Sequence, residues 1–100
     1  TNPEQLVAAA HAGCFSMALS GAIGRAGHDV VSIETSADVS IEKGTDGWAI
    51  TRIVLTTVAA VPGMSDEDFQ EAAEGAKKGC PVSKALAGVD TIELNATLKN

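Results

Sequence analysis

The first quarter of the chain has the apolar pattern of a long helix. Asn2 is a good N-terminal cap, and Pro3 suits the first helical position. Good helix formers continue to Ile23, and Gly24 then begins a stop signal. Apolar residues surround this predicted helix instead of forming one stripe, so we expect it to be buried on most sides. Its many alanines and glycines would let another backbone approach closely, and a second subunit is expected to cover it.

The pattern then changes to a period of two, which is typical of strands. Apolar and polar residues alternate from 31 to 41, which predicts a long strand with one solvated face. A turn rich in Gly and Asp at 42–47 separates it from a second β-rich stretch at 48–61. We therefore expect a hairpin over 30–61, with Trp48 packed at the start of the second strand.

The remaining residues predict two helices and a third strand. Ser65, with an acidic residue three positions later, favours a helix start, and the helix should run to about Lys78. A short helix is expected through Leu86, and 89–98 reads as a strand. The order α-β-β-α-α-β predicts a single α+β domain over 1–100, a two-layer sandwich with a small sheet and helices on one face. Phenylalanines 15 and 69 are expected in its core.

Composition narrows the class of protein. One hundred residues with 45% hydrophobic side chains fit one compact domain, and the longest apolar stretch is too interrupted by polar residues to predict a membrane span. A net charge of −6 and only 3% aromatic residues argue against nucleic acid binding.

Two cysteines are too few for a disulfide scaffold, which favours a reducing, cytoplasmic setting. The opening "TNPEQ" resembles a helix start, so an upstream segment is expected.

The two cysteines are the main candidates for chemistry. Cys80 lies between Gly79 and Pro81 at a predicted helix N-terminus, where free N–H groups favour a thiolate, and Lys77 and Lys78 are expected to add positive charge.

Cys14 lies in the middle of the first helix, and a hydrophobic molecule could pack on its face. The pattern leaves open whether Cys14 is a functional thiol or an inert small apolar residue. His11 is expected to be a core histidine and His28 to be solvated, and a zinc site built on these histidines and cysteines lacks a second close ligand pair. The face of Cys14 includes Val7, Ala10, His11, Met17 and Ala18.

Residues 1–20 and 79–86 together closely resemble the OsmC/Ohr family of thiol-dependent hydroperoxide reductases. The similarity extends over essentially the whole chain, and the sequence "HAGCFSMALS" looks more like the OsmC branch. The resemblance implies an antioxidant peroxidase of the oxidative stress response that reduces organic hydroperoxides without a metal or flavin cofactor. Cys14 matches the peroxidatic cysteine, Cys80 the resolving cysteine that forms a disulfide with it, and Glu4 the active-site glutamate.

The resemblance also implies partners for this site. Re-reduction in the family is by dithiols, lipoyl groups above all, and an arginine from an N-terminal β segment holds the peroxidatic thiolate. Neither Arg25 nor Arg52 matches that arginine. Glu4 and Cys14 on one straight helix lie about 15 Å apart, so we expect each site to take its glutamate from the other subunit of a homodimer. The apolar face around Cys14 favours organic hydroperoxides over hydrogen peroxide.

Two other functions fit parts of the pattern. The sequence "GAIG" at 21–24 matches the G-x-x-G loop of KH-like RNA-binding domains, although only Arg25 is basic nearby. A purely structural oligomerisation module with incidental thiols is the third reading.

Overall fold

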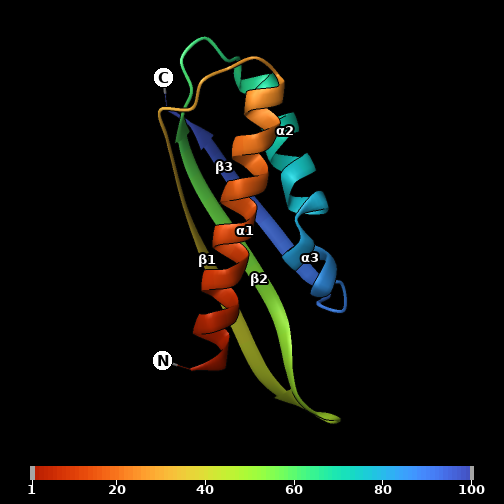
Figure 1. Cartoon of the computed structure of the whole chain (residues 1–100). Coiled ribbons are helices and arrows are strands. Elements are labelled where there is room, and N and C mark those ends of the chain that lie inside the picture. The colour runs from red at the N-terminus through yellow and green to blue at the C-terminus, as the bar shows by residue number, and fades with distance from the viewer. Residues whose placement is uncertain (1, 100) are drawn as a thin grey trace.

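The computed structural model describes residues 2–99 and has the expected element order (Figure 1). The three strands form a mixed sheet in the order β1-β2-β3, in which β1 and β2 are antiparallel and β3 runs parallel to β2. The helices lie together on one face of this sheet, which confirms the predicted α+β two-layer architecture (Figure 1). The elements are α1 (Pro3–Arg25), β1 (Ser32–Gly44), β2 (Gly47–Ala60), α2 (Asp66–Gly79), α3 (Pro81–Ala85) and β3 (Thr91–Leu98).

Local signals set both ends of α1. Asn2 caps the helix through a reciprocal capping box with Gln5, whose backbone N–H donates to the Asn2 side chain over 2.9 Å. The helix ends at Arg25, and Gly27 then adopts a φ of +90°, which glycine reaches without the steric cost of a Cβ.

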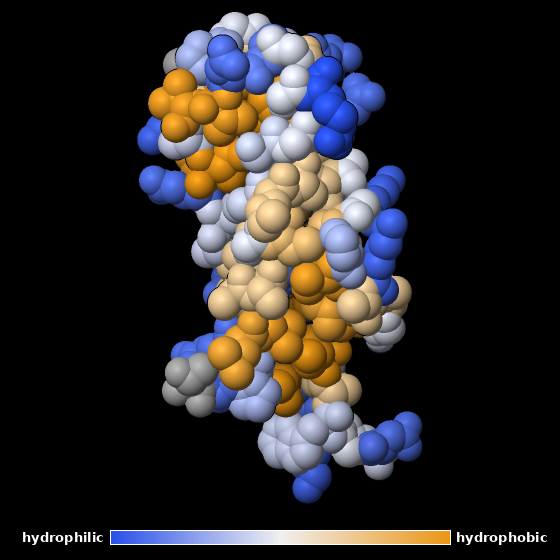
Figure 2. Space-filling model, viewed as in Figure 1, coloured by the Kyte–Doolittle hydropathy of each residue, from blue (hydrophilic) through white to orange (hydrophobic). Residues whose placement is uncertain are grey.

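Only one stripe of α1 is buried within the chain. The buried residues are His11, Phe15, Leu19 and Ile23, which recur at every fourth position. The expectation of burial on most sides is therefore wrong for a single chain, because a helix lying on one sheet buries only the side that faces the sheet. Met17 is 78% exposed, and Figure 2 shows apolar colours along the outward side of α1.

The helix α1 is also long enough and apolar enough to cross a membrane. Its most apolar stretch has a mean hydropathy of 1.6. Helices that cover the core of soluble proteins pass the same test, so this property is weak evidence for a membrane location. In this structure the buried stripe of α1 packs on the sheet.

The sheet has one apolar and one polar face. Along β2, Ile53, Leu55, Thr57 and Ala59 are fully buried, and Arg52 alternates with them on the exposed face. Beyond a register shift in the β1–β2 pairing, the hairpin extends past the N-terminal end of α1 (Figure 1).

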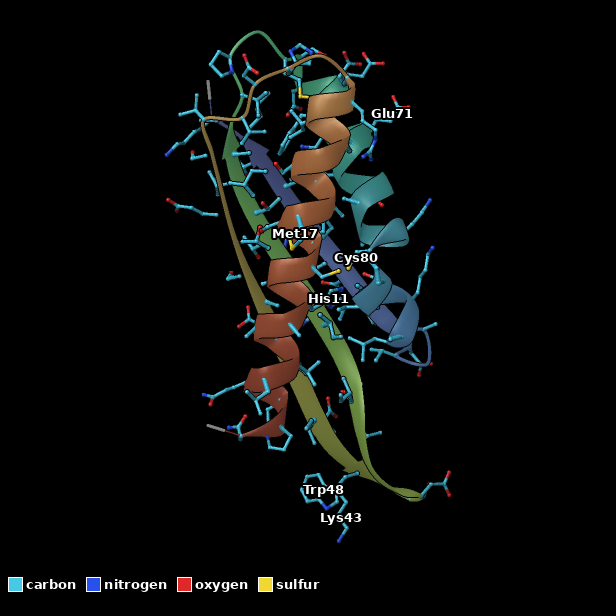
Figure 3. The ribbon with its side chains drawn as sticks, in the orientation of Figure 1. His11, Met17, Lys43, Trp48, Glu71 and Cys80 are labelled. Carbon is cyan, nitrogen blue, oxygen red and sulfur yellow. The ribbon has the colours of Figure 1, made fainter. Side chains whose placement is uncertain are left out.

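The hairpin tip carries Trp48, which is 72% exposed, so its predicted packing is wrong for the single chain. The reason is geometric: the tip lies beyond the helices, and Trp48 projects there beside Lys43 (Figure 3). Phe15 and Phe69 are fully buried, as predicted.

The second helix covers the upper part of the same sheet face. Ser65 caps α2 by accepting a hydrogen bond from the Asp68 backbone N–H over 3.1 Å. Phe69, Ala73 and Ala76 form its buried side, and α2 ends at Gly79.

The two faces of β2 give a direct test of this architecture. Leu55→Ala should lower the free energy of unfolding by about 2–5 kcal/mol, because it removes buried methyl groups and leaves a cavity. Its neighbour Thr56 points to the exposed face, so Thr56→Ala should cost less than about 1 kcal/mol. Urea unfolding followed by circular dichroism measures both values. Equal losses in the two variants would contradict the one-sided core.

Candidate thiol site

Cys14 and Cys80 meet between α1 and the start of α3. Both cysteines are free thiols, with Cys14 half-buried and Cys80 fully buried. The two side chains lie close enough that each shifts the pKa of the other. The fold therefore brings together two cysteines that are far apart in the sequence.

Cys80 occupies the junction between α2 and α3. It ends α2, and its side chain caps α3 by accepting a hydrogen bond from the Ser83 backbone N–H, with a nitrogen–sulfur distance of 3.4 Å. Pro81 follows as the first residue of α3, which agrees with the predicted helix start.

The two thiols have pKa values shifted in opposite directions. Burial raises the pKa of Cys14, the nearby Val82 backbone lowers it, and the neighbouring Cys80 thiol raises it. Burial acts to raise the pKa of Cys80, but the neighbouring Cys14 thiol and Ser83, whose backbone N–H donates to the sulfur, outweigh it, so the net shift is downward. Cys80 is therefore the more acidic thiol of the pair.

His11 extends this cluster on the α1 side. It is fully buried, and its Nε2 lies 2.7 Å from the Ser83 hydroxyl oxygen. Its Nδ1 has no hydrogen-bond partner among residues 2–99. Burial lowers the pKa of His11, so the ring is neutral near pH 7. Figure 3 shows His11 of α1 close to Cys80 at the start of α3.

The burial of His11 was predicted from the sequence, whereas the contact of Ser83 with this histidine was not. The spacing of Ser83 and Cys80 is a local signal for part of this arrangement. The side chain of a helix-capping residue accepts a hydrogen bond from the backbone N–H three positions later, and Ser83 has this position relative to Cys80. The contact between Ser83 and His11 had no local signal, since it joins two distant segments.

Lys77, one of the two expected cations, is directed away from the cysteines. The Lys77 ammonium donates to the Ile92 carbonyl over 3.3 Å and lies 3.6 Å from the Glu74 carboxylate, so it is directed toward β3. Arg52 pairs with Glu93 over 2.6 Å on the exposed face of the sheet.

Glu4 lies in the first turn of α1 and is half-buried. The helix is continuous from Glu4 to Cys14, so the two residues are separated by about 15 Å along its axis. Within one chain the glutamate is thus remote from both thiols.

The structure argues against two alternative sites, an RNA-binding loop and a zinc site. Residues 21–24 lie inside α1 and form no loop, so the KH-like prediction is wrong. Within residues 2–99, no group of three or more His, Cys, Asp or Glu side chains is arranged to hold a metal ion.

A groove of about 720 Å³ runs between α1 and α2. Its lining includes Met17, Gly21 and Arg25 from α1 and Glu71 and Gly79 from α2. Neither cysteine lines it, although Gly79 directly precedes Cys80. The groove thus adjoins the thiol site without containing it.

With two adjoining thiols on an α+β scaffold, the chain belongs to the OsmC-like protein family, whose model matches residues 1–95. It is 50% identical over 93 residues to the Peroxiredoxin OsmC of Escherichia coli (strain K12), an alignment that covers 93% of this chain and 65% of the relative. It is 36% identical over 102 residues to the Organic hydroperoxide resistance protein of Xanthomonas axonopodis pv. citri, covering 98% of this chain and 66% of that protein. The chain thus spans slightly less than two thirds of the length of these two relatives.

Solved structures have the same fold. The crystal structure of the organic hydroperoxide resistance protein OhrB of Bacillus subtilis matches 99% of this chain and 70% of that chain, with a TM-score of 0.73 and 33% identity. An OsmC-like protein from Mycoplasma pneumoniae matches with a TM-score of 0.87 at 21% identity, covering 99% of this chain and 72% of that one, which supports the fold alone.

The buried neutral histidine predicts an acid-sensitive stability. The unfolded chain binds a proton on His11 below about pH 6.5, whereas the lowered pKa keeps the folded ring neutral. Stability should therefore fall as the pH drops below 6.5, with up to about 1 kcal/mol lost by pH 5.5. His11→Gln removes the titrating group, so its stability should change less between pH 7.5 and 5.5. Urea unfolding at both pH values checks this, and parallel losses in both proteins would contradict it.

Proposed function

We propose that the thiol pair forms the reaction centre of a peroxidase that reduces organic hydroperoxides to alcohols in the response to oxidative stress. The observation that carries the proposal is the proximity of Cys14 and Cys80, which shift each other's pKa, because two neighbouring thiols can be oxidised to a disulfide by local movement. Membership of the OsmC-like family and the names of its relatives support the same activity.

The proposed reaction proceeds in two balanced steps. The Cys14 thiolate attacks the distal oxygen of ROOH, the O–O bond breaks, and the alkoxide takes up a proton and leaves as ROH. Cys14 is then a sulfenic acid. The Cys80 thiolate attacks the Cys14 sulfur, the S–O bond breaks, and hydroxide leaves as water after protonation. An external dithiol, of the lipoyl type, reduces the resulting disulfide, and no metal or flavin takes part.

The first step requires a proton to leave Cys14, whose pKa is raised by burial. The arginine that the family resemblance implies would stabilise the Cys14 thiolate, and we expect it from a segment outside this sequence. A cytoplasmic location, where thiols stay reduced, fits this chemistry.

We also propose that the chain works as a homodimer. The outward side of α1 is apolar and lined with small residues, and it carries the exposed Leu6 and Met17 (Figure 2). Antiparallel packing of this side against the same helix of a second copy would cover it and would bring Glu4 of each chain toward the Cys14 of the other. Neither nucleic acid nor a membrane is needed as a partner.

The substrate preference follows from the surroundings of Cys14. Its half-buried neighbours Val7 and Ala18 on α1 are apolar, and the Cys14 sulfur approaches the Val82 backbone. An alkyl hydroperoxide can bury its chain there, whereas hydrogen peroxide gains nothing from such a lining. We therefore expect a higher kcat/KM for cumene hydroperoxide than for hydrogen peroxide.

Serine variants of the two cysteines test the chemistry. In the full-length protein, Cys14→Ser should abolish consumption of cumene hydroperoxide, because a serine hydroxyl cannot form a sulfenic acid. Cys80→Ser should still consume about one equivalent but should stop there, with a sulfenic acid at Cys14. Mass spectrometry after one equivalent of peroxide should show the loss of two hydrogens in the unmodified protein only. Unchanged turnover in Cys14→Ser would refute the peroxidase assignment.

A substitution at Gly13 tests the dimer. A Cβ added at Gly13 meets no atom within 4 Å, so Gly13→Leu fits the single chain. In the proposed dimer the leucine would separate the packed helices and should raise the dissociation constant at least tenfold. Lys78→Leu, which places the same side chain on the exposed side of α2, should leave association unchanged. Analytical ultracentrifugation measures both, and a monomeric unmodified protein would contradict the proposal.

A further inference from the structure

We infer that Trp48, at the tip of the β1–β2 hairpin, docks into the groove between α1 and α2 of a second copy of the chain, next to Met17 of that copy. Among the described residues, Met17 and Trp48 are the two most exposed large apolar side chains. The inference rests on the homodimer of the proposed function and is independent of the peroxidase chemistry.

A β-bulge in the hairpin turns Trp48 to the side of the sheet that carries the helices. In the β1–β2 pairing Ser40 lies opposite Arg52, whereas Ile41 lies opposite Ile50, so one residue of β2 is left unpaired. An extra residue of this kind shifts the alternation of side chains between the two faces of a sheet. Ile50 therefore packs against the core, and Trp48, two residues before it, faces the same side.

The tip lies beyond the reach of α1 in its own chain. Ser16 of α1 and Thr35 of β1 are hydrogen-bonded over 2.7 Å and so lie level with each other. From Thr35 to Lys43, β1 advances ~26 Å, at about 3.3 Å per residue. From Ser16 back to its first residue, α1 covers only ~20 Å, at about 1.5 Å per residue. Lys43 and its cross-strand partner Trp48 thus lie past the N-terminal end of α1, as Figure 1 shows for the hairpin.

The proposed dimer places the helix of the second copy over this tip. Antiparallel packing that brings Glu4 of each chain toward Cys14 of the other puts the two-fold axis level with Ala9, midway between them. Met17 of the second copy then lies ~12 Å beyond the axis, at about 1.5 Å per residue, which is level with the N-terminal end of the first α1. The C-terminal half of the second α1 therefore continues past this end and covers the hairpin tip.

The groove of the second copy has room for the indole ring. Met17 and Gly21 line its α1 side, and Ala72 and Gly75 line its α2 side. These small residues leave space between the helices, and the Met17 thioether makes a favourable contact with an aromatic ring. Burial of a tryptophan removes about 150–250 Å² of surface from water, and two-fold symmetry repeats the contact. Docking of Trp48 would therefore stabilise the dimer at two places.

The tip and the groove also carry complementary charges. The side chain of Lys43 projects beside Trp48 at the tip (Figure 3). Glu71 lines the groove, together with Asp68 and Arg25, whose charges offset each other. Neither Lys43 nor Glu71 has an ion-pair partner among residues 2–99. Lys43 of one copy can therefore pair with Glu71 of the other when Trp48 is docked.

Fluorescence of Trp48 in the full-length protein tests the docking, with the spectrum of Trp48→Phe subtracted to isolate this ring. In the dimer the emission should lie at short wavelength and resist quenching by acrylamide, and dilution to the monomer should shift it to longer wavelength. Met17→Gln should shift the Trp48 emission of the dimer to longer wavelength. Within one chain Met17 and Trp48 are remote (Figure 3), so this effect can come only from the second copy.

Charge reversal tests the pairing of Lys43 with Glu71. Lys43→Glu or Glu71→Lys alone should raise the dissociation constant of the dimer about fivefold, because two-fold symmetry makes each change act twice. The two changes together should restore the constant to within about twofold. As a control, Glu67→Lys makes the same change on α2 outside the groove and should not compensate Lys43→Glu. Analytical ultracentrifugation measures all four variants.

A dimer in which Trp48 emits as a solvent-exposed indole would overturn this inference and leave the homodimer standing. Emission that stays at short wavelength in the monomer would overturn it as well, because the ring would then be covered within its own chain. The absence of compensation between the two charge reversals would also contradict it. A monomeric full-length protein would overturn both the inference and the homodimer. Neither measurement uses peroxide, so the peroxidase assignment is tested separately.

Discussion

The contact of one helical stripe with one face of the sheet determines where everything else lies. His11, Phe15, Leu19 and Ile23 recur at every fourth position, and burying all four fixes the rotation of α1 about its axis. Cys14 then lies on the flank of the helix that meets α3. Any rotation of α1 would expose part of this stripe and would also separate the two thiols.

Two polar clusters complement this apolar contact. Ser16 of α1 donates to Thr35 of β1 over 2.7 Å, and Thr35 lies 3.0 Å from the hydroxyl oxygen of Thr57 on β2. The His11–Ser83 pair joins α1 to α3 in the same way. Apolar packing tolerates small displacements along the helix axis, whereas buried hydrogen bonds do not, so these clusters specify the axial position of α1. They give the thiol site its fixed geometry.

The same one-sided packing leaves large apolar side chains outside. Leu6, Met17, Val31 and Trp48 are all more than half exposed. Of these, Leu6 and Met17 lie on α1, and an apolar helix side is typical of an interface, whereas Trp48 lies at the hairpin tip. In the proposed homodimer, the second copy would cover the outward side of α1 and would influence access to Cys14.

The sequence by itself determined the elements and much of the chemistry. Capping residues and period-two alternation are local signals, so the helix capped by Asn2 and the β1–β2 hairpin were predicted nearly to their ends. The motifs around Cys14 and Cys80 indicated the family for a similar reason, since they lie within short segments. Only the tertiary structure decided which side of α1 is buried, that Trp48 extends past the core, and that Ser83 links His11 to Cys80. Those features depend on contacts between distant segments, and no periodicity along one segment records which partner it will meet.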